Sequence, residues 1–345
     1  MPKKQVAVIG ATGFTGSELL RILVHHPGVD IALITSESSE GEEFSDVHPF
    51  FKNILDTKLK SVDEIENYDI DVAFLALPHG ISMEYVQKLG HVDFPIIDFS
   101  GDFRLSDPDI YEQWYSKTHT YPKGFEGAVY GIPELYASQI KSARLIANPG
   151  CYPTSVILAV APLLKAGLID PSQIIADSKS GVTGTGVKAK PVNHYSSVNE
   201  NFRAYGLKTH RHSIEIQQKM QGFTDERVSV LFTPHLLPVD RGILSTIYLK
   251  PSKGECSAQQ LSQVYSMYDG CRFIRMVDQP PSIKDVRGTN FCDIYATYDE
   301  RTHTIIVISV IDNLMKGAAG QAVQNMNIIF NWDEDYGLHQ VPMYP

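Results

Sequence analysis

One cysteine of this chain stands where its thiol could act as a nucleophile. Cys151 follows Asn148-Pro149-Gly150 and opens a helix-like run that extends to Ala166. The partial positive charge at a helix N-terminus stabilises a thiolate and lowers the pKa of the thiol. Because a thiolate at neutral pH is an effective nucleophile, we predict that Cys151 is catalytic. The other cysteines are predicted to be small buried apolar side chains: Cys256, Cys271 and Cys292.

A cysteine nucleophile needs an acid/base partner, and His210 and His212 flank Arg211 before a helix-like segment. Ser213 is of a type that caps helices, so we expect the helix to begin there and both histidines to precede it. Residues two apart in an extended loop point the same way, so both rings could reach one site. We favour His210 as the acid/base and His212 as its support or as a substrate ligand. The pair could also bind zinc, but no complementary ligand cluster accompanies it, and no metal is predicted.

A glycine-rich turn near the N-terminus predicts a dinucleotide site. Gly10-Ala11-Thr12-Gly13-Phe14-Thr15-Gly16 follows the apolar run Val6 to Ile9 and opens a helix expected from Gly16 to His26. Gly10 permits the tight turn, Gly13 lets the backbone approach a pyrophosphate, and Gly16 allows close helix–strand packing. The free N–H groups of the helix N-terminus would hold the phosphates. The spacing GxxGxxG is a variant of the usual fingerprint.

The end of the second expected strand favours NADP over NAD. An acidic residue there would bind the ribose 2′-hydroxyl and repel a 2′-phosphate. The hydroxyls of Thr35, Ser36 and Ser38 suit a phosphate, whereas Glu37 is ambiguous because its direction is unknown.

Two further loops carry predictions about ligands. The loop from Ser180 to Gly186 is rich in glycine, and we expect it to form an anion-binding nest or to let a ligand lie against its backbone at Gly181 and Gly184. Asn313 stands between a strand and the last expected helix, where its amide could orient a nicotinamide carboxamide.

The elements that must position these residues alternate in the first half of the chain. Strands are expected at 6–9, 29–35, 72–76, 96–99 and 145–147, with helix-like segments between them. This alternation predicts a parallel sheet covered on both faces. In the second half, strands at 174–178, 228–232, 243–249 and 304–311 succeed one another with few helices, which predicts a mixed-sheet α+β domain. A last helix is expected at 318–330.

Composition excludes several classes of protein. At 345 residues, two domains are expected, and 43% hydrophobic residues indicate a globular chain. A net charge of −10 without a Lys/Arg run argues against nucleic acid as a partner. The most apolar stretch, Val156 to Leu164, is too short to cross a bilayer. The four cysteines form no CxxC pair, and no secretory signal precedes the first strand, so a reducing, cytoplasmic setting is expected.

Together, these motifs resemble the N-acetyl-γ-glutamyl-phosphate reductases, and the resemblance runs the length of the chain. Its blocks are Gly10-Ala11-Thr12-Gly13, Leu77-Pro78-His79-Gly80, Asp98-Phe99-Ser100-Gly101-Asp102-Phe103-Arg104, Tyr130 to Leu135, Asn148 to Thr154, Ser180 to Gly186, His210 to Ile216, Pro234 to Pro238 and Asp312 to Gln321. Gly101 stands where alanine is commoner, and Ile214 where proline is expected. Neither departure removes a group with chemistry.

The resemblance implies an α/β fold with an N-terminal Rossmann-like dinucleotide-binding domain and an α+β mixed-sheet catalytic and dimerisation domain. It places the NADP-binding domain at 1–147, completed by a C-terminal helix at 317–345, and the catalytic domain at 148–316. It implies NADPH-dependent reduction of N-acetyl-γ-glutamyl phosphate to the 5-semialdehyde, with release of phosphate, through a thioester on Cys151. The enzyme would serve arginine biosynthesis as a homodimer or homotetramer.

The resemblance also implies residue roles. Catalysis would use Cys151, His210 and His212. The cofactor would contact Gly10, Thr12, Gly13, Phe14, Thr15, Gly16, Ser36, Ser38, Pro78, Gly181, Gly184 and Asn313. The substrate would contact Arg104, Arg211 and Glu215, since a guanidinium pairs with a carboxylate or phosphate.

Three alternative functions remain open at this point. They are a carrier-protein-linked acyl-phosphate reductase of lysine biosynthesis, an aspartate-semialdehyde dehydrogenase and a non-catalytic NADP sensor. Aspartate-semialdehyde dehydrogenases typically have Gly-Cys-Asn where this chain has Gly-Cys-Tyr. A sensor would have no use for a cysteine at a helix start. A short-chain reductase is disfavoured, because none of the 17 tyrosines has a lysine four residues on.

Overall fold

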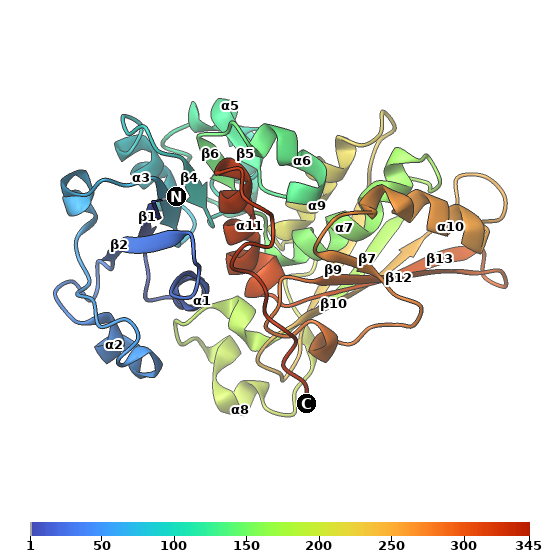
Figure 1. Cartoon of the computed structure of the whole chain (residues 1–345). Coiled ribbons are helices and arrows are strands. Elements are labelled where there is room, and N and C mark those ends of the chain that lie inside the picture. The colour runs from blue at the N-terminus through green and yellow to red at the C-terminus, as the bar shows by residue number, and fades with distance from the viewer. Residues whose placement is uncertain (1) are drawn as a thin grey trace. The chain divides into compact units, whose positions relative to one another are not determined.

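The computed structural model describes residues 2–345 and divides them into two compact units. The N-terminal unit runs to Pro149 and includes Ala318–His339, and the C-terminal unit comprises Gly150–Gly317 with Gln340–Pro345 (Figure 1). No helix within residues 2–345 is long and apolar enough to span a bilayer.

The N-terminal unit is built on a six-stranded sheet in which every neighbouring pair is parallel. Its order is β2 (Val29–Thr35), β1 (Lys4–Ile9), β3 (Val72–Leu75), β4 (Ile96–Asp98), β6 (Leu145–Ala147) and β5 (Ala128–Tyr130). The strands are apolar runs because both faces of the sheet are covered, and all of β3 is buried. The strand order reverses beside β1, where ligands of such sheets bind at the carboxyl ends. The predicted doubly covered parallel sheet is confirmed.

Helices and the returning chain complete this unit. They are α1 (Phe14–Leu23), α2 (Phe44–Val47), α3 (Ser82–Lys88), α4 (Pro108–Tyr115), α5 (Gly124–Gly127), α6 (Pro133–Ile140) and α11 (Gly320–Ile329). Helix α1 begins two residues before the expected Gly16, because Gly13 takes the N-cap position. After a π-helical turn at Met315–Ala319, α11, the red helix of Figure 1, packs on α1, α6 and β4.

The C-terminal unit contains a mixed seven-stranded sheet, as predicted. Its order is β11 (Ile274–Met276), β12 (Cys292–Asp299), β13 (Thr304–Ile311), β10 (Ile243–Leu249), β7 (Ile174–Ser180), β9 (Val230–Leu236) and β8 (Arg203–Ala204). Three helices pack on it: α7 (Cys151–Lys165) contacts β10 and β13, α9 (His212–Gln221) contacts β9, and α10 (Ala258–Tyr265) contacts β12. A short helix, α8 (Tyr195–Val198), lies in the long connection before β8.

One face of this sheet is less covered than the other. Alternate residues of β10 are buried, as expected when helices cover one side of a pleated strand. On the opposite side, a row of aligned apolar residues crosses four strands, and we call it the open sheet face: Leu231, Ile175, Tyr248 and Ile306. Leu231 is 58% exposed. Such a row is available for contact with another surface.

Candidate active site

Cys151 is the first residue of α7, with Gly150 as the extended N-cap. The side chain is half-buried, and its sulfur forms no disulfide bond. The partial positive charge at a helix N-terminus favours an anionic sulfur at this position. One turn further on, Ser155 bonds Ser245 and Ser309 of the sheet, each at 3.0 Å, and so fixes α7 on β10 and β13. The structure thus provides a rigid helix start for the cysteine.

His212 lies directly against the N-cap of that helix. A Cβ atom added to Gly150 would stand 2.5 Å from Nε2 of His212, so the ring fills the space that a side chain would need. The Gly150 N–H donates to Oε1 of Glu215 at 2.9 Å, and Glu215 is fully buried. Helix α9 therefore brings an imidazole nitrogen and a carboxylate to the residue before Cys151.

His210 supports His212 from the preceding turn. Their ring centroids are 4.8 Å apart, and the N–H of His212 donates to Nδ1 of His210 at 3.2 Å. A nitrogen that accepts this bond carries no proton, so the neutral ring holds its hydrogen on Nε2. Burial, aided by the charge of Arg211, lowers the pKa of His210 to about 4. His210 is accordingly neutral near pH 7.

The prediction that Ser213 caps this helix is wrong. Helix α9 begins at His212, and its N-cap, Arg211, already has helical backbone angles. The physical reason is a preceding turn: the N–H of His210 donates to the Gly206 carbonyl and that of Ser213 to the His210 carbonyl. The backbone therefore winds before the serine. The two rings are nonetheless neighbours.

Two tyrosines that sequence reasoning did not single out enclose the histidines. The Tyr152 ring lies edge-on to both, 5.8 Å from His210 and 5.9 Å from His212. Its hydroxyl donates to the His235 carbonyl and accepts from Tyr205 at 3.3 Å. Burial raises the pKa of Tyr205 to about 12 and that of Tyr152 further, so both stay protonated. The only sequence signal was the position of Tyr152 beside the nucleophile.

Gly317 closes the other side of Cys151. A Cβ atom at position 317 would lie 2.8 Å from Cβ of Cys151, which only a glycine avoids. The N–H of Gly317 donates to the Asp312 carbonyl at 3.0 Å. This contact also escaped the sequence analysis, although Gly317 stands in one of the blocks that carry the resemblance.

The loop from Gly181 to Gly186 is not an anion-binding nest, and that prediction is wrong. Residues Val182–Thr185 form a 3-10 helix. Main-chain carbonyls of the C-terminal unit accept the N–H groups of Gly181, Val182, Thr183, Gly184 and Gly186. An anion therefore meets few N–H groups there. Contact between a ligand and the backbone at Gly181 or Gly184 stays a prediction.

Asn313 joins two of the loops in this unit. Its Oδ1 accepts the Gly242 N–H at 2.8 Å, and its Nδ2 donates to Oγ1 of Thr183 at 2.9 Å. The side chain is buried. The amide thus has a structural role within the C-terminal unit, and its contact with a nicotinamide stays a prediction.

In the N-terminal unit, the glycine turn follows β1 at the strand-order reversal. Gly10 has φ +83°, and a Cβ atom there would lie 2.7 Å from the Ala76 carbonyl oxygen. A Cβ atom at Gly16 would lie 2.6 Å from the Ala11 carbonyl oxygen, so this glycine permits close packing. Gly13 instead has no heavy atom within 4 Å of its Cβ position. The open space lies beside Gly13, which is the residue expected to face the pyrophosphate. The turn therefore fits a dinucleotide.

Hydroxyl groups gather beside this turn. Thr12 Oγ1 lies 3.2 Å from Ser36 Oγ, which in turn lies 3.4 Å from Ser38 Oγ. Glu37 is exposed, and its Oε1 accepts the Tyr85 hydroxyl at 2.7 Å. Tyr85 therefore holds the carboxylate whose direction the sequence left open. Other predicted cofactor contacts of this unit are only partly buried or exposed: Phe14, Thr15 and Pro78.

The predicted substrate ligands lie in different surroundings. Arg104 is buried in the N-terminal unit, where its Nε donates to the Asn148 carbonyl at 2.8 Å and its Nη2 to the Phe99 carbonyl at 2.6 Å. Arg211 is exposed at the start of α9, and Glu215 is buried beneath Gly150. Substrate binding by these residues stays a prediction. The bonds of Arg104 also hold the segment that leads to Cys151.

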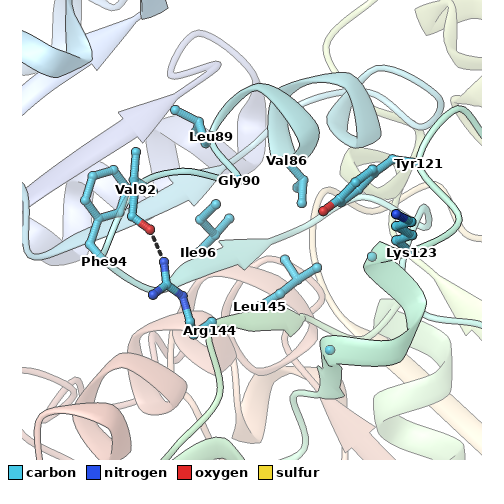
Figure 2. Close-up of a pocket in the computed structure, with 12 residues that line it drawn as sticks. Val86, Leu89, Gly90, Val92, Phe94, Ile96, Tyr121, Lys123, Arg144 and Leu145 are labelled. Atoms are coloured by element: carbon cyan, nitrogen blue, oxygen red, sulfur yellow. Dashed lines mark hydrogen bonds between the residues drawn. The ribbon is translucent and has the colours of Figure 1, made fainter.

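Two cavities within residues 2–345 lie away from these residues. One of about 170 Å³ in the N-terminal unit is lined by Ile96 and Leu145, the first residues of β4 and β6 (Figure 2). It therefore lies at the amino ends of the strands, opposite the glycine turn, and Arg144 at its edge donates to the Val92 carbonyl. A cavity of about 560 Å³ beside α10 contains none of the predicted site residues. Within residues 2–345, no group of three or more potential ligand side chains could hold a metal ion.

Gly150→Ala is expected to lower kcat on the order of 10²-fold, because the new methyl group must displace the His212 ring or the start of α7. Misplacement of about 1 Å is enough for such a loss. Steady-state kinetics measure it. Gly222→Ala, at the end of α9, is the matched control, since its Cβ atom would meet nothing closer than 3.4 Å. A Gly150→Ala enzyme as active as this control would contradict the contact.

Comparison with known proteins gives one consistent family. Residues 5–143 match the family described as semialdehyde dehydrogenase, NAD binding domain, and residues 151–313 match semialdehyde dehydrogenase, dimerisation domain. Curated proteins named N-acetyl-gamma-glutamyl-phosphate reductase are 47% identical in Citrifermentans bemidjiense, 48% in Pelotomaculum thermopropionicum and 43% in Bacillus subtilis. Each alignment covers 99% of this chain and at least 99% of the relative.

Solved structures show the same fold at lower identity. Aspartate semialdehyde dehydrogenase II of Vibrio cholerae, complexed with ASA, is 18% identical and has a TM-score of 0.72 over 96% of this chain and 99% of that chain. The Candida albicans aspartate semialdehyde dehydrogenase with NADP is 14% identical and has a TM-score of 0.71 over 95% and 98% of the two chains.

Proposed function

The chain belongs to the family of N-acetyl-gamma-glutamyl-phosphate reductases, and from this membership we propose that it reduces N-acetyl-γ-glutamyl phosphate to N-acetylglutamate 5-semialdehyde in arginine biosynthesis. The observation that carries the proposal is the start of α7, where Cys151 follows a glycine pressed against Nε2 of His212. A thiolate and an imidazole at one helix N-terminus suit acyl transfer. None of the four cysteines, all within residues 2–345, forms a disulfide bond, and we place the reaction in the reducing cytoplasm.

The proposed reaction proceeds through two substitutions at the acyl carbon. The Cys151 thiolate forms a C–S bond to the γ-carbonyl carbon, and the bond from that carbon to the phosphate oxygen breaks, which releases inorganic phosphate and leaves a thioester. NADPH, when bound, supplies the hydride that reduces this thioester. The resulting thiohemiacetal loses the Cys151 thiolate as its C–S bond breaks, and the aldehyde is released. A thiolate serves both as nucleophile and as leaving group.

We assign the proton transfers to His212 rather than to the initially favoured His210. His212 Nε2 adjoins the residue before the nucleophile, whereas His210 uses Nδ1 to accept the His212 N–H. His212 would protonate the oxygen of the thiohemiacetal as it forms and remove that proton when the aldehyde is released. His210, neutral near pH 7, would hold His212 in position. Tyr152, edge-on to both rings, restricts their rotation.

The enzyme is expected to prefer NADPH to NADH. The hydroxyls of Thr12, Ser36 and Ser38 can donate to a 2′-phosphate, and Tyr85 holds the nearby Glu37 carboxylate. Comparing kcat/KM for the two cofactors measures the preference. Tyr85→Phe is expected to reduce the ratio of kcat/KM for NADPH to kcat/KM for NADH severalfold, because the Glu37 carboxylate is released. The value of kcat should not change. A wild-type enzyme that prefers NADH would contradict the assignment.

The reaction is tested most simply in reverse. We expect NADP⁺ reduction with N-acetylglutamate 5-semialdehyde that depends strictly on inorganic phosphate, and little reduction with aspartate semialdehyde. Activity with the aspartate analogue alone would overturn the substrate. A requirement for a carrier-protein-linked substrate would move the enzyme to the lysine branch.

We also propose that two copies associate through the open sheet face. The matched dimerisation domain contains all four residues of this face, and Leu231, Ile175 and Tyr248 are exposed large apolar side chains, which mark an interaction surface where they are contiguous. Analytical ultracentrifugation of Leu231→Glu should then show monomers. An unchanged association state would place the interface elsewhere.

A further inference from the structure

Asp312 is a buried carboxylate that joins four segments of the C-terminal unit. Its Oδ2 accepts the Gly288 N–H at 2.7 Å, and its Oδ1 accepts the N–H groups of Leu314 and Met315 at 2.9 and 3.1 Å. Arg241 donates hydrogen bonds to both oxygens, from Nε to Oδ2 and from Nη2 to Oδ1, each at 3.0 Å. Asp312 is fully buried, and the Arg241 side chain is 14% exposed. A charge so deeply buried is tolerated because it is paired and hydrogen-bonded.

This carboxylate determines the path of the turn that reaches Cys151. Oδ1 of Asp312 accepts the N–H groups of Leu314 and Met315, where the chain enters the turn. The main-chain carbonyl of Asp312 accepts the N–H of Gly317. Gly317 in turn lies against Cβ of Cys151, with no room for a methyl group. A shift of this turn by a fraction of an ångström would therefore change the position of the cysteine.

The neighbouring residues connect Arg241 to the same turn by a second path. The N–H of Gly242, next to Arg241, donates to Oδ1 of Asn313, next to Asp312. The pair is thus anchored on both sides, through its side chains and through the adjacent main chain. Neither residue carries a role in the chemistry derived above.

We propose that Arg241 and Asp312 are positioning residues that, through the turn ending at Gly317, hold Cys151 at the N-terminus of α7. The proposal rests on the proposed role of Cys151 as nucleophile. It assigns the pair to the geometry of the thiolate rather than to contact with substrate or cofactor.

The test compares Arg241→Lys with Arg275→Lys. Arg275 forms an equivalent two-bond pair with the buried Asp293 in the same unit, at 2.6 and 2.8 Å, and serves as the matched control. Arg241→Lys keeps the charge but loses the planar fork. We expect kcat to fall about tenfold or more with the KM for the acyl phosphate within about twofold, because an interaction that acts on the reacting geometry is lost. Arg275→Lys should leave kcat within about twofold, even where both variants lose similar thermal stability.

A second readout does not depend on the substrate. The pH midpoint of Cys151 alkylation by iodoacetamide should rise by about one unit in Arg241→Lys, because the sulfur is less well held at the helix N-terminus. It should not move in Arg275→Lys. If the lysine variant does not fold, Asp312→Asn replaces it, since the amide oxygen still accepts N–H groups. If the pH midpoint of Cys151 alkylation in the tested variant equals that of the wild type, the proposal is overturned, whichever acyl phosphate the enzyme reduces.

A double-mutant cycle with Gly317→Ala tests the path. If Arg241 acts through Gly317, the double variant should lose no more kcat than the worse single variant. Losses that multiply would show that Arg241 acts elsewhere. If the pH midpoint of Cys151 alkylation shifts in Arg241→Lys but the wild-type enzyme reduces no acyl phosphate, the proposed function is refuted. The positioning role of Arg241 then still stands.

Discussion

Replacing Cys151 with serine is expected to lower the reductase activity on the order of 10⁴-fold or more, as loss of a covalent nucleophile does. A serine hydroxyl is barely ionised at neutral pH, so neither thioester formation nor thiolate departure can occur. The glycine turn belongs to the other unit, and NADPH affinity should stay within about threefold of the wild type. Activity assays and cofactor titration by fluorescence measure the two quantities.

Cys271→Ser is the control for this substitution, since Cys271 is also half-buried but stands at no helix start. It should retain full activity. Iodoacetamide should label Cys151 faster than the other cysteines, of which Cys256 has a thiol pKa raised by burial. Bound acyl phosphate should protect Cys151. Equal labelling of all four cysteines would remove the argument for an activated thiol.

The second large effect is expected at His212. His212→Asn should lower kcat by about 10²–10⁴-fold, the range of general acid–base catalysis, and remove one limb of the pH–rate profile. The asparagine keeps a polar side chain against Gly150 but cannot exchange a proton near pH 7. Initial rates from pH 5.5 to 9.5 provide the profile.

His210→Asn is the matched comparison. With a pKa of about 4, His210 is already neutral throughout that range, so its loss should leave the limb in place. We expect a fall in kcat of less than about tenfold and a rise in the KM for the acyl phosphate, since His212 loses its support. A larger loss of kcat in His210→Asn would reverse the two roles. If neither substitution costs tenfold, the proton donor lies elsewhere.

The features that could be predicted from sequence are those whose cause is local. The strand before Gly10 and the helix after it could be placed to within a few residues, and with them the glycine turn that they enclose. Cys151 could be placed at a helix start because the turn just before it begins that helix. Apolar runs identified the strands of the parallel sheet, because burial on both faces requires them.

The features that escaped prediction depend on distant partners. Glu215 accepts a hydrogen bond from Gly150, 65 residues away, and nothing in the local sequence reveals this contact. The N–H of Gly181 is taken by the Gly242 carbonyl, which no glycine count reveals. Ser213 has the residue type of a helix cap, but the turn bonds from Gly206 onward start the winding earlier. In the first two cases hydrogen bonds to distant residues decide the contact, and in the third local main-chain hydrogen bonds override the preference of the residue type.

The central claim is that Cys151 carries the substrate as a thioester, and one measurement tests it most directly. The enzyme is mixed with N-acetyl-γ-glutamyl phosphate without NADPH, quenched in acid, digested and examined by mass spectrometry, with released phosphate measured in parallel. We expect one phosphate per active site and one N-acetylglutamyl group on the peptide that contains Cys151, lost again on addition of NADPH. Phosphate release without acylation of Cys151, or acylation at another residue, would contradict the account.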